Sequence, residues 1–118
     1  MRSLSAVPVW FEEAEREVGK SVGNHTAVDR DDSGALVLRL WNHPIVTYNP
    51  DQSVTLRLCG YRTATTRDRL NRALGGRGNI NSVRGEWSLR TFGRDALPEP
   101  IVFADEMTVH EGGAVDLR

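Results

Sequence analysis

The stretch Ser53–Gly76, SVTLRLCGYRTATTRDRLNRALGG, changes its hydrophobic period within a few residues. In its first part Val54, Leu56 and Leu58 alternate with Thr55, Arg57 and Cys59, which predicts a half-buried antiparallel strand with Cys59 on the solvent side. Its second part predicts a helix over about 66–74, too short to be stable alone. We expect this helix to pack on a sheet through one apolar face, made of Leu70, Ala73 and Leu74.

The ends of this helix can be predicted from capping residues. Thr65 is a good N-cap, because its hydroxyl can accept a hydrogen bond from an unpaired backbone N–H. Asp68, three residues later, completes the [ST]-x-x-[DE] capping pattern. Gly75 is the expected terminator, and Gly75–Gly78 then predicts a flexible turn, since it lacks the features of a phosphate loop.

The rest of the chain predicts hairpins and one more short helix. A short helix is predicted over about residues 9–18, because glutamates lie near its start and Val9, Phe11, Ala14 and Val18 form a loose apolar stripe. Turns are expected at 32–34, 50–52, 84–86 and 111–113, with Asn42-His43-Pro44 interrupting a strand. We expect Trp41, Val83, Trp87 and Leu89 to point inward.

The predicted fold class is therefore α+β, an antiparallel meander with one well-defined helix. The 118 residues and their 39% hydrophobic content fit one domain, 1–118, with an N-terminal helix or arm at 1–21 and a core at 22–115. A single cysteine excludes an internal disulfide. No segment approaches the ~20 apolar residues that span a bilayer, so we expect a soluble protein without a membrane partner.

No set of residues indicates catalysis. His25, His43 and His110 are scattered, without the spacing of metal ligands, so we predict no metal, no cofactor and no catalytic residue. An acidic cluster, Asp29, Asp31 and Asp32, is interpreted as a turn. A small hydrolase or nuclease is accordingly the weakest functional hypothesis.

The charges are unevenly distributed, although the net charge is −1. Residues 1–33 carry four basic and seven acidic groups, residues 34–94 carry ten and three, and residues 95–118 carry one and six. Either the flanks neutralise the basic middle within the fold, or the middle presents a positive surface to an anionic partner.

The arginines at the start of the helix favour the second interpretation. Cations are disfavoured near a helix N-terminus by up to ~1 kcal/mol each, so Arg67, in the second helical position, needs a reason. One explanation is that these side chains are solvated and the unfavourable interaction with the helix dipole is small. The other is that they bind a phosphate or carboxylate. The candidate ligand-binding residues are Tyr61, Arg62, Thr63, Thr65, Thr66, Arg67, Arg69, Asn71 and Arg72.

This part of the chain resembles a family of small uncharacterised proteins encoded by tailed bacteriophages and prophages. The family motif is similar to Gly-Gly-Trp-x-Thr-x-Thr-Thr-[Lys/Arg]-x-Arg-[Leu/Met/Ile]-Asn, which matches here from Gly60 through Asn71. The flanks VGNHTAV, IVTYNPDQSVTLRL, EWSLR and VFADEMTVHEGG extend the resemblance over roughly residues 22–115. Cys59, Tyr61 and Glu106 depart from it, standing where the family has glycine, tryptophan and glycine.

The resemblance implies a phage protein that acts in the cytoplasm of an infected bacterium or is assembled into a virion, and it carries over no catalytic residue. We expect a binding module for a nucleic acid or nucleotide, acting on host processes or host defence, with phosphate at the helix start and a base stacked on Tyr61. The alternative is a protein-interaction module, which binds a host protein or forms a homo-oligomer.

Overall fold

The larger sheet consists of hairpins that follow one another along the chain. The computed structural model describes residues 7–58, 60 and 62–117. The sheet has seven antiparallel strands in the order β1-β2-β3-β4-β5-β9-β10. They are β1 (Ser21–Gly23), β2 (Thr26–Arg30), β3 (Leu36–Leu40), β4 (His43–Tyr48), β5 (Val54–Arg57), β9 (Glu106–Val109) and β10 (Val115–Leu117). The chain thus leaves this sheet after β5 and returns beside it as β9.

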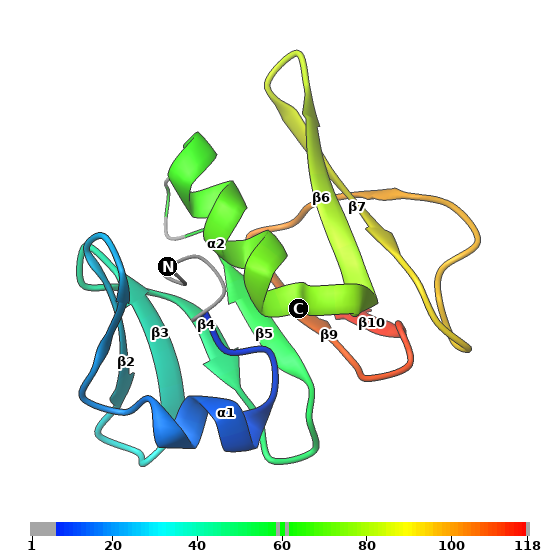
Figure 1. The fold of residues 1–118 in the computed structure, drawn as a ribbon. Coiled ribbons are helices and arrows are strands. Elements are labelled where there is room, and N and C mark those ends of the chain that lie inside the picture. The colour runs from blue at the N-terminus through cyan, green and yellow to red at the C-terminus, as the bar shows by residue number, and fades with distance from the viewer. Residues whose placement is uncertain (1–6, 59, 61, 118) are drawn as a thin grey trace.

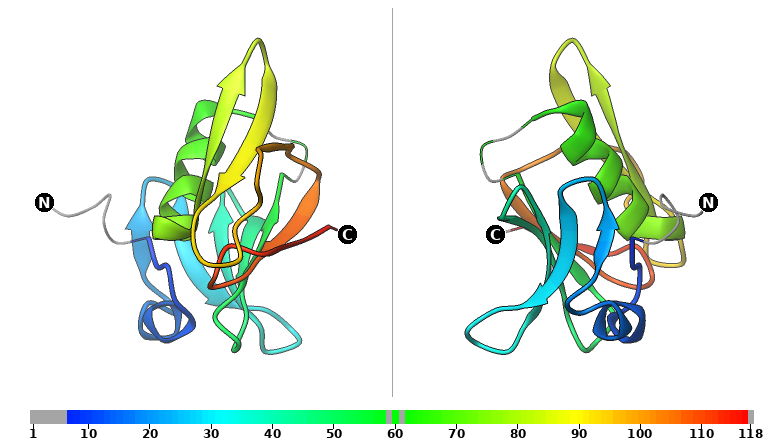
Figure 2. Two further views of the ribbon diagram at one scale, coloured as in Figure 1. Left: turned by 90° about the vertical axis from the view of Figure 1, so that its right-hand side faces the viewer. Right: turned by 60° about the vertical axis from the view of Figure 1, so that its left-hand side comes forward.

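A second layer fills the excursion between β5 and β9. It contains α2 (Ala64–Leu74) and an antiparallel sheet of β6 (Gly78–Val83), β7 (Glu86–Thr91) and β8 (Ile101–Val102). The helix contacts β4 and β5 of the larger sheet and β6 of the smaller one, and the β6–β7 hairpin projects beyond the body (Figures 1 and 2). The predicted α+β class is confirmed, and so is the buried helix face of Leu70, Ala73 and Leu74.

The first helix, α1 (Phe11–Arg16), is shorter than the predicted 9–18. At its start the side chain of Glu13 accepts hydrogen bonds from the backbone N–H groups of Val9 and Trp10. It ends early because Val18 already forms a parallel bridge with Val28 of the larger sheet. No helix in the described ranges is long and apolar enough to cross a membrane.

The predicted hairpin turns are found, but two apolar side chains that were predicted to point inward are exposed. Trp41 and Asn42 form the β3–β4 turn, with φ of 55° and 72°, so His43 and Pro44 begin β4 instead of interrupting a strand. Trp41 is 61% exposed and Val83 is 65% exposed. The inward predictions are wrong for both, because each lies at a hairpin end, beyond the packed part of its strand.

Arg77 holds three segments together beneath α2. A 3₁₀ turn, Gly75–Arg77, follows the helix, and Arg77 in it is buried. Its guanidinium group donates to the carbonyl oxygens of Val9, Gln52, Ala73 and Leu74, and lies 4.5 Å from the ring centroid of Trp10. Burial lowers the pKa of Arg77. The segment predicted as a flexible turn is therefore connected by hydrogen bonds to the N-terminal segment, the β4–β5 turn and the end of α2.

Candidate functional site

The N-terminus of α2 begins two residues earlier than predicted. Thr63, with an extended backbone, is the N-cap: its Oγ1 accepts from the N–H of Thr66 at 3.1 Å, and the two hydroxyl groups lie 3.0 Å apart. Thr66 is buried, so the hydroxyl that it presents to Thr63 is sheltered from water. The prediction of Thr65 as the cap is wrong, and the capping pattern with Asp68 is absent.

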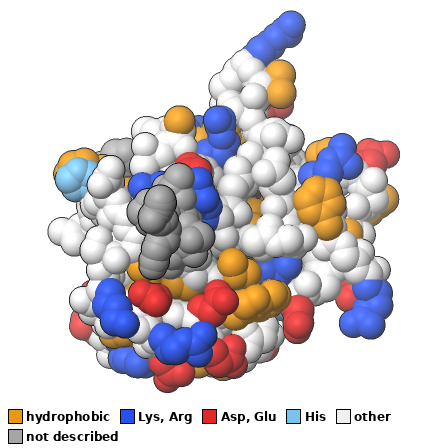
Figure 3. Space-filling model, viewed as in Figure 1, with side chains coloured by type: hydrophobic (Ala, Val, Ile, Leu, Met, Phe, Trp, Pro, Cys, Tyr) orange, Lys and Arg blue, Asp and Glu red, His pale blue; other side chains and the backbone are white. Residues whose placement is uncertain are grey.

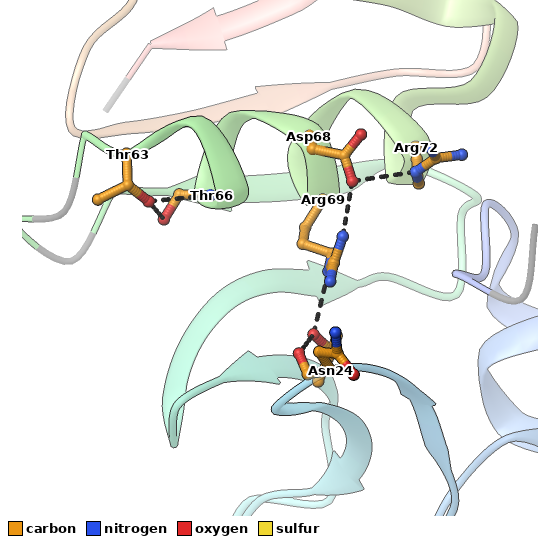
Figure 4. Close-up of polar contacts among 7 residues, drawn as sticks. Asn24, Thr63, Thr66, Asp68, Arg69 and Arg72 are labelled. Carbon is orange, nitrogen blue, oxygen red and sulfur yellow. Dashed lines mark hydrogen bonds and ion pairs between the residues drawn. The ribbon is translucent and has the colours of Figure 1, made fainter. Parts of the chain in front are cut away.

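Asp68 instead pairs with two arginines of its own helix. Its Oδ2 accepts from Arg69 Nη1 at 2.6 Å and from Arg72 Nε at 3.1 Å. Figure 4 shows these three side chains together, away from the end of the helix where Thr63 and Thr66 lie. The positive charges of Arg69 and Arg72 are thus partly neutralised within α2.

Arg69 also joins α2 to the larger sheet. Its side chain is buried, and Nε donates to Thr26 Oγ1 at 3.0 Å. The Thr26 hydroxyl in turn donates to the carbonyl oxygen of Asn24 at 2.6 Å, which completes a chain of hydrogen bonds from helix to hairpin (Figure 4). Arg69 therefore positions the helix relative to the β1–β2 turn.

Asn71 joins the same helix to the smaller sheet. Its amide accepts from the N–H of Ile80 at 2.6 Å and donates to the carbonyl oxygen of Ile80 at 3.1 Å. The two bonds satisfy the backbone groups of Ile80 on the open edge of β6, as the backbone of a neighbouring strand would. Three candidate ligand residues, Arg69, Asn71 and Arg72, thus use polar groups of their side chains in intramolecular contacts.

Arg62 and Arg67 form a separate pair over one aromatic ring. Their Cζ atoms lie 5.9 and 6.0 Å from the ring centroid of Trp87, which is buried on β7. Within the described residues, neither guanidinium has a carboxylate at ion-pair distance. Arg67 is the fourth helical residue, not the second as predicted, so the cost of its charge is smaller than expected.

The first turn of α2 has hydrogen-bonding groups that the described residues leave unused. The backbone N–H groups of Ala64 and Thr65 and the hydroxyl of Thr65 have no partner in the part of the chain that the structure describes. Unpaired N–H groups at a helix start carry partial positive charge. Arg62, directly before the N-cap, and Arg67, in the first turn, add positive charge to the same end of the helix, so this end favours an anion.

A pocket of about 510 Å³ opens beside this N-terminus. It is lined by Leu40, Trp41, His43, Ile45, Thr63, Thr65 and Thr66. The Trp41 ring stacks on His25, with centroids 3.5 Å apart and planes inclined by 18°. Trp41 and His43 line the pocket but are not among the site residues predicted from the sequence. The turn-favouring residues Asn42, His43 and Pro44 could have indicated this placement, because a chain reversal there puts Trp41 at the tip of a hairpin.

Two predictions concern residues outside the described ranges. Stacking of a base on Tyr61 stays a prediction, and so does the solvent-facing orientation of Cys59. The third departure from the phage motif, Glu106, begins β9 and pairs with Arg57 of β5, with Nε and Oε1 3.3 Å apart.

Some of the basic middle is neutralised by the acidic flanks. Arg57–Glu106 is one such pair, and Arg39–Asp29 at 3.4 Å is another. The surface around α1 mixes both signs, whereas a basic side chain stands at the tip of the projecting hairpin (Figure 3). In the described part of the chain, no group of three or more His, Cys, Asp or Glu residues could hold a metal ion.

Comparisons with known proteins give one family. The Kyanoviridae Gp96 protein family matches residues 14–110, which include both sheets' central strands, α2 and the pocket. No curated protein and no solved structure matches the chain. The phage origin implied by the sequence resemblance is thereby confirmed: the chain belongs to the Kyanoviridae Gp96 protein family, a family of bacteriophage proteins.

Proposed function

We propose that this phage protein is an accessory protein that binds a phosphate-bearing ligand, a nucleic acid or a nucleotide, at the N-terminus of α2. Under this proposal it acts in the cytoplasm of the infected bacterium, on host processes or host defence. The observation that carries the proposal is the pair Arg62 and Arg67, which converge over Trp87 without a carboxylate among the described residues.

Two like charges at one helix start repel each other. Each also interacts unfavourably with the positive end of the helix dipole. A phosphate would remove both penalties, because guanidinium groups and backbone N–H groups are its usual partners. The N–H groups of Ala64 and Thr65, which have no partner among the described residues, would supply the backbone part of that site. Asp68 does not compete for Arg67, since its Oδ2 accepts from Arg69 and Arg72.

The test is calorimetric titration with ATP and with a short mixed single-stranded oligonucleotide. A double variant, Arg62→Gln with Arg67→Gln, should bind at least about tenfold more weakly, because each lost charged hydrogen bond costs about 1.5–3 kcal/mol. The matched control is Arg84→Gln with Arg90→Gln, which removes two exposed arginines of the smaller sheet.

Salt separates the two ligand classes. If the ligand is nucleic acid, affinity should fall steeply between about 50 and about 200 mM salt, and the slope should decrease in the Arg62/Arg67 variant. Equal weakening in the control variant would mean that only overall charge matters. Absence of binding by both probes at low salt, with no thermal shift, would end the proposal.

A second candidate function is self-association or binding of a host protein. It is favoured by the exposed apolar side chains of Val83 and Val102 on strands of the smaller sheet. If the basic middle of one chain meets the acidic ends of another, light scattering should show association that decreases with added salt. A monomer at both ionic strengths would leave only the host partner.

A further inference from the structure

The pocket beside α2 has an exposed aromatic wall. Trp41 lies at the tip of the β3–β4 hairpin and is 61% exposed, although an indole ring is among the most costly side chains to leave in water. Its backbone is left-handed, with φ of 55°, a conformation that bulky side chains rarely adopt.

The neighbouring hairpin holds the ring in place. His25, also left-handed with φ of 51°, stacks on Trp41, and its carbonyl oxygen accepts from the N–H of Trp41 at 2.9 Å. The β1–β2 turn that carries His25 is in turn joined to α2 through Thr26 and Arg69. The aromatic wall and the helix side of the pocket are therefore positioned by one continuous set of contacts.

The pocket is lined by both apolar side chains and hydroxyl groups. Leu40 and Ile45 supply apolar surface, while Thr65 supplies a hydroxyl group that has no partner within the described residues. A flat ring with polar edges fits such a lining, because its face can stack and its edge can form hydrogen bonds. A purely aliphatic group would fill the apolar part of the pocket but would make no use of the Thr65 hydroxyl.

We infer that this pocket binds a nucleobase, which stacks on Trp41, so that the ligand of the site is a nucleotide unit. The inference rests on the proposed function for the phosphate, which would lie at the N-terminus of α2, on the threonine side of the same pocket. The unit can be a free nucleotide or one nucleotide of a single strand, since both offer the same base and phosphate. An apolar side chain of a protein partner is the competing occupant.

The experiment compares probes that carry the base, the phosphate or both. AMP, adenosine, ribose 5-phosphate and inorganic phosphate are titrated into the full-length protein, with tryptophan fluorescence and calorimetry as readouts. AMP should bind more tightly than either base-free probe, and should quench fluorescence in the parent protein. An oligodeoxyadenylate in place of AMP distinguishes a single strand from a free nucleotide.

Variants of Trp41 test the stacking. Trp41→Leu should weaken AMP at least about fivefold and leave inorganic phosphate unchanged, whereas Trp41→Phe should keep most of the affinity because a phenyl ring also stacks. Phe92→Leu, which alters another exposed aromatic side chain outside the pocket, is the matched control and should change neither.

The outcomes separate the two proposals. If AMP and ribose 5-phosphate bind equally, or if Trp41→Leu has no effect on AMP, the base pocket is refuted while the phosphate site stands. Binding of adenosine as tight as that of AMP would keep the base pocket and refute the phosphate site. If no probe binds, both proposals are refuted, and the protein-partner occupant is favoured.

Discussion

Arg69 of α2 and Thr26 of β2 are joined across the two layers of the molecule, with Nε donating to Oγ1 at 3.0 Å. Thr26 directly follows His25, whose ring stacks on Trp41. A contact between a helix and a strand thus links α2 to the turn whose His25 ring stacks on Trp41. In this arrangement Arg69, a residue of the family-like motif, uses its Nε to connect the helix to the strand next to the pocket. Its predicted contact with a ligand stays a prediction.

The Arg69–Thr26 contact should contribute measurably to stability. Thr26→Val leaves a buried guanidinium N–H without an acceptor, and should lower the free energy of unfolding by about 2 kcal/mol. Arg69→Met should cost a similar amount, and the double variant should lose less than the sum of the two. Urea unfolding of the four proteins in a double-mutant cycle measures the coupling. Strict additivity would contradict a direct interaction.

Much of the fold could be predicted because its strands follow simple physical patterns. Val54, Leu56 and Leu58 alternate with polar residues, and burial of one face of a sheet requires that alternation. The hairpin at Arg84–Gly85 was predictable for a related reason, since both residues adopt positive φ in a turn that favours glycine. Local sequence therefore determined these elements.

The site was harder to predict because tertiary contacts decide it. Thr63, Thr65 and Thr66 can all cap a helix, and the choice of Thr63 depends on burial of Thr66. A buried arginine such as Arg69 is also unexpected, since charged side chains are rarely enclosed unless they are paired. The stacking of Trp41 on His25, sixteen residues away in sequence, is likewise a tertiary contact that local patterns do not predict.

The observed helix start can be tested against the predicted one. Thr63→Ala removes the hydroxyl that accepts from the N–H of Thr66, and should lower the free energy of unfolding by about 1 kcal/mol. Thr65→Ala should change it by less than about 0.5 kcal/mol, because Thr65 is an exposed residue within the first turn. Chemical denaturation measures both. A larger loss for Thr65→Ala would restore the prediction made from sequence.

Asn71 should protect the edge of β6. In Asn71→Leu the N–H and carbonyl groups of Ile80 lose their partners, so unfolding should become easier by about 2 kcal/mol. Hydrogen exchange followed by NMR should show faster exchange at the Ile80 amide than in the parent protein. Asn81→Leu, on an exposed residue of the same strand, is the control. Unchanged protection of Ile80 in Asn71→Leu would show that the helix itself covers the edge.

The β4–β5 turn should make stability depend on pH in the acidic range. Hydrogen bonds from the Ser53 hydroxyl and N–H groups, at 2.6 and 2.9 Å, hold the pKa of Asp51 below its ordinary value of 3.8. Because the folded protein has the lower pKa, the contribution of Asp51 is fully present above about pH 4 and is lost as the pH falls through the folded value. Asp51→Asn should therefore lower the thermal midpoint at neutral pH and show a smaller decrease on acidification. The same turn carries Gln52, which bonds to α1, so a local loss would reach the N-terminal helix. If acidification lowered the thermal midpoints of the parent protein and of Asp51→Asn by the same amount, the pH dependence would not come from Asp51.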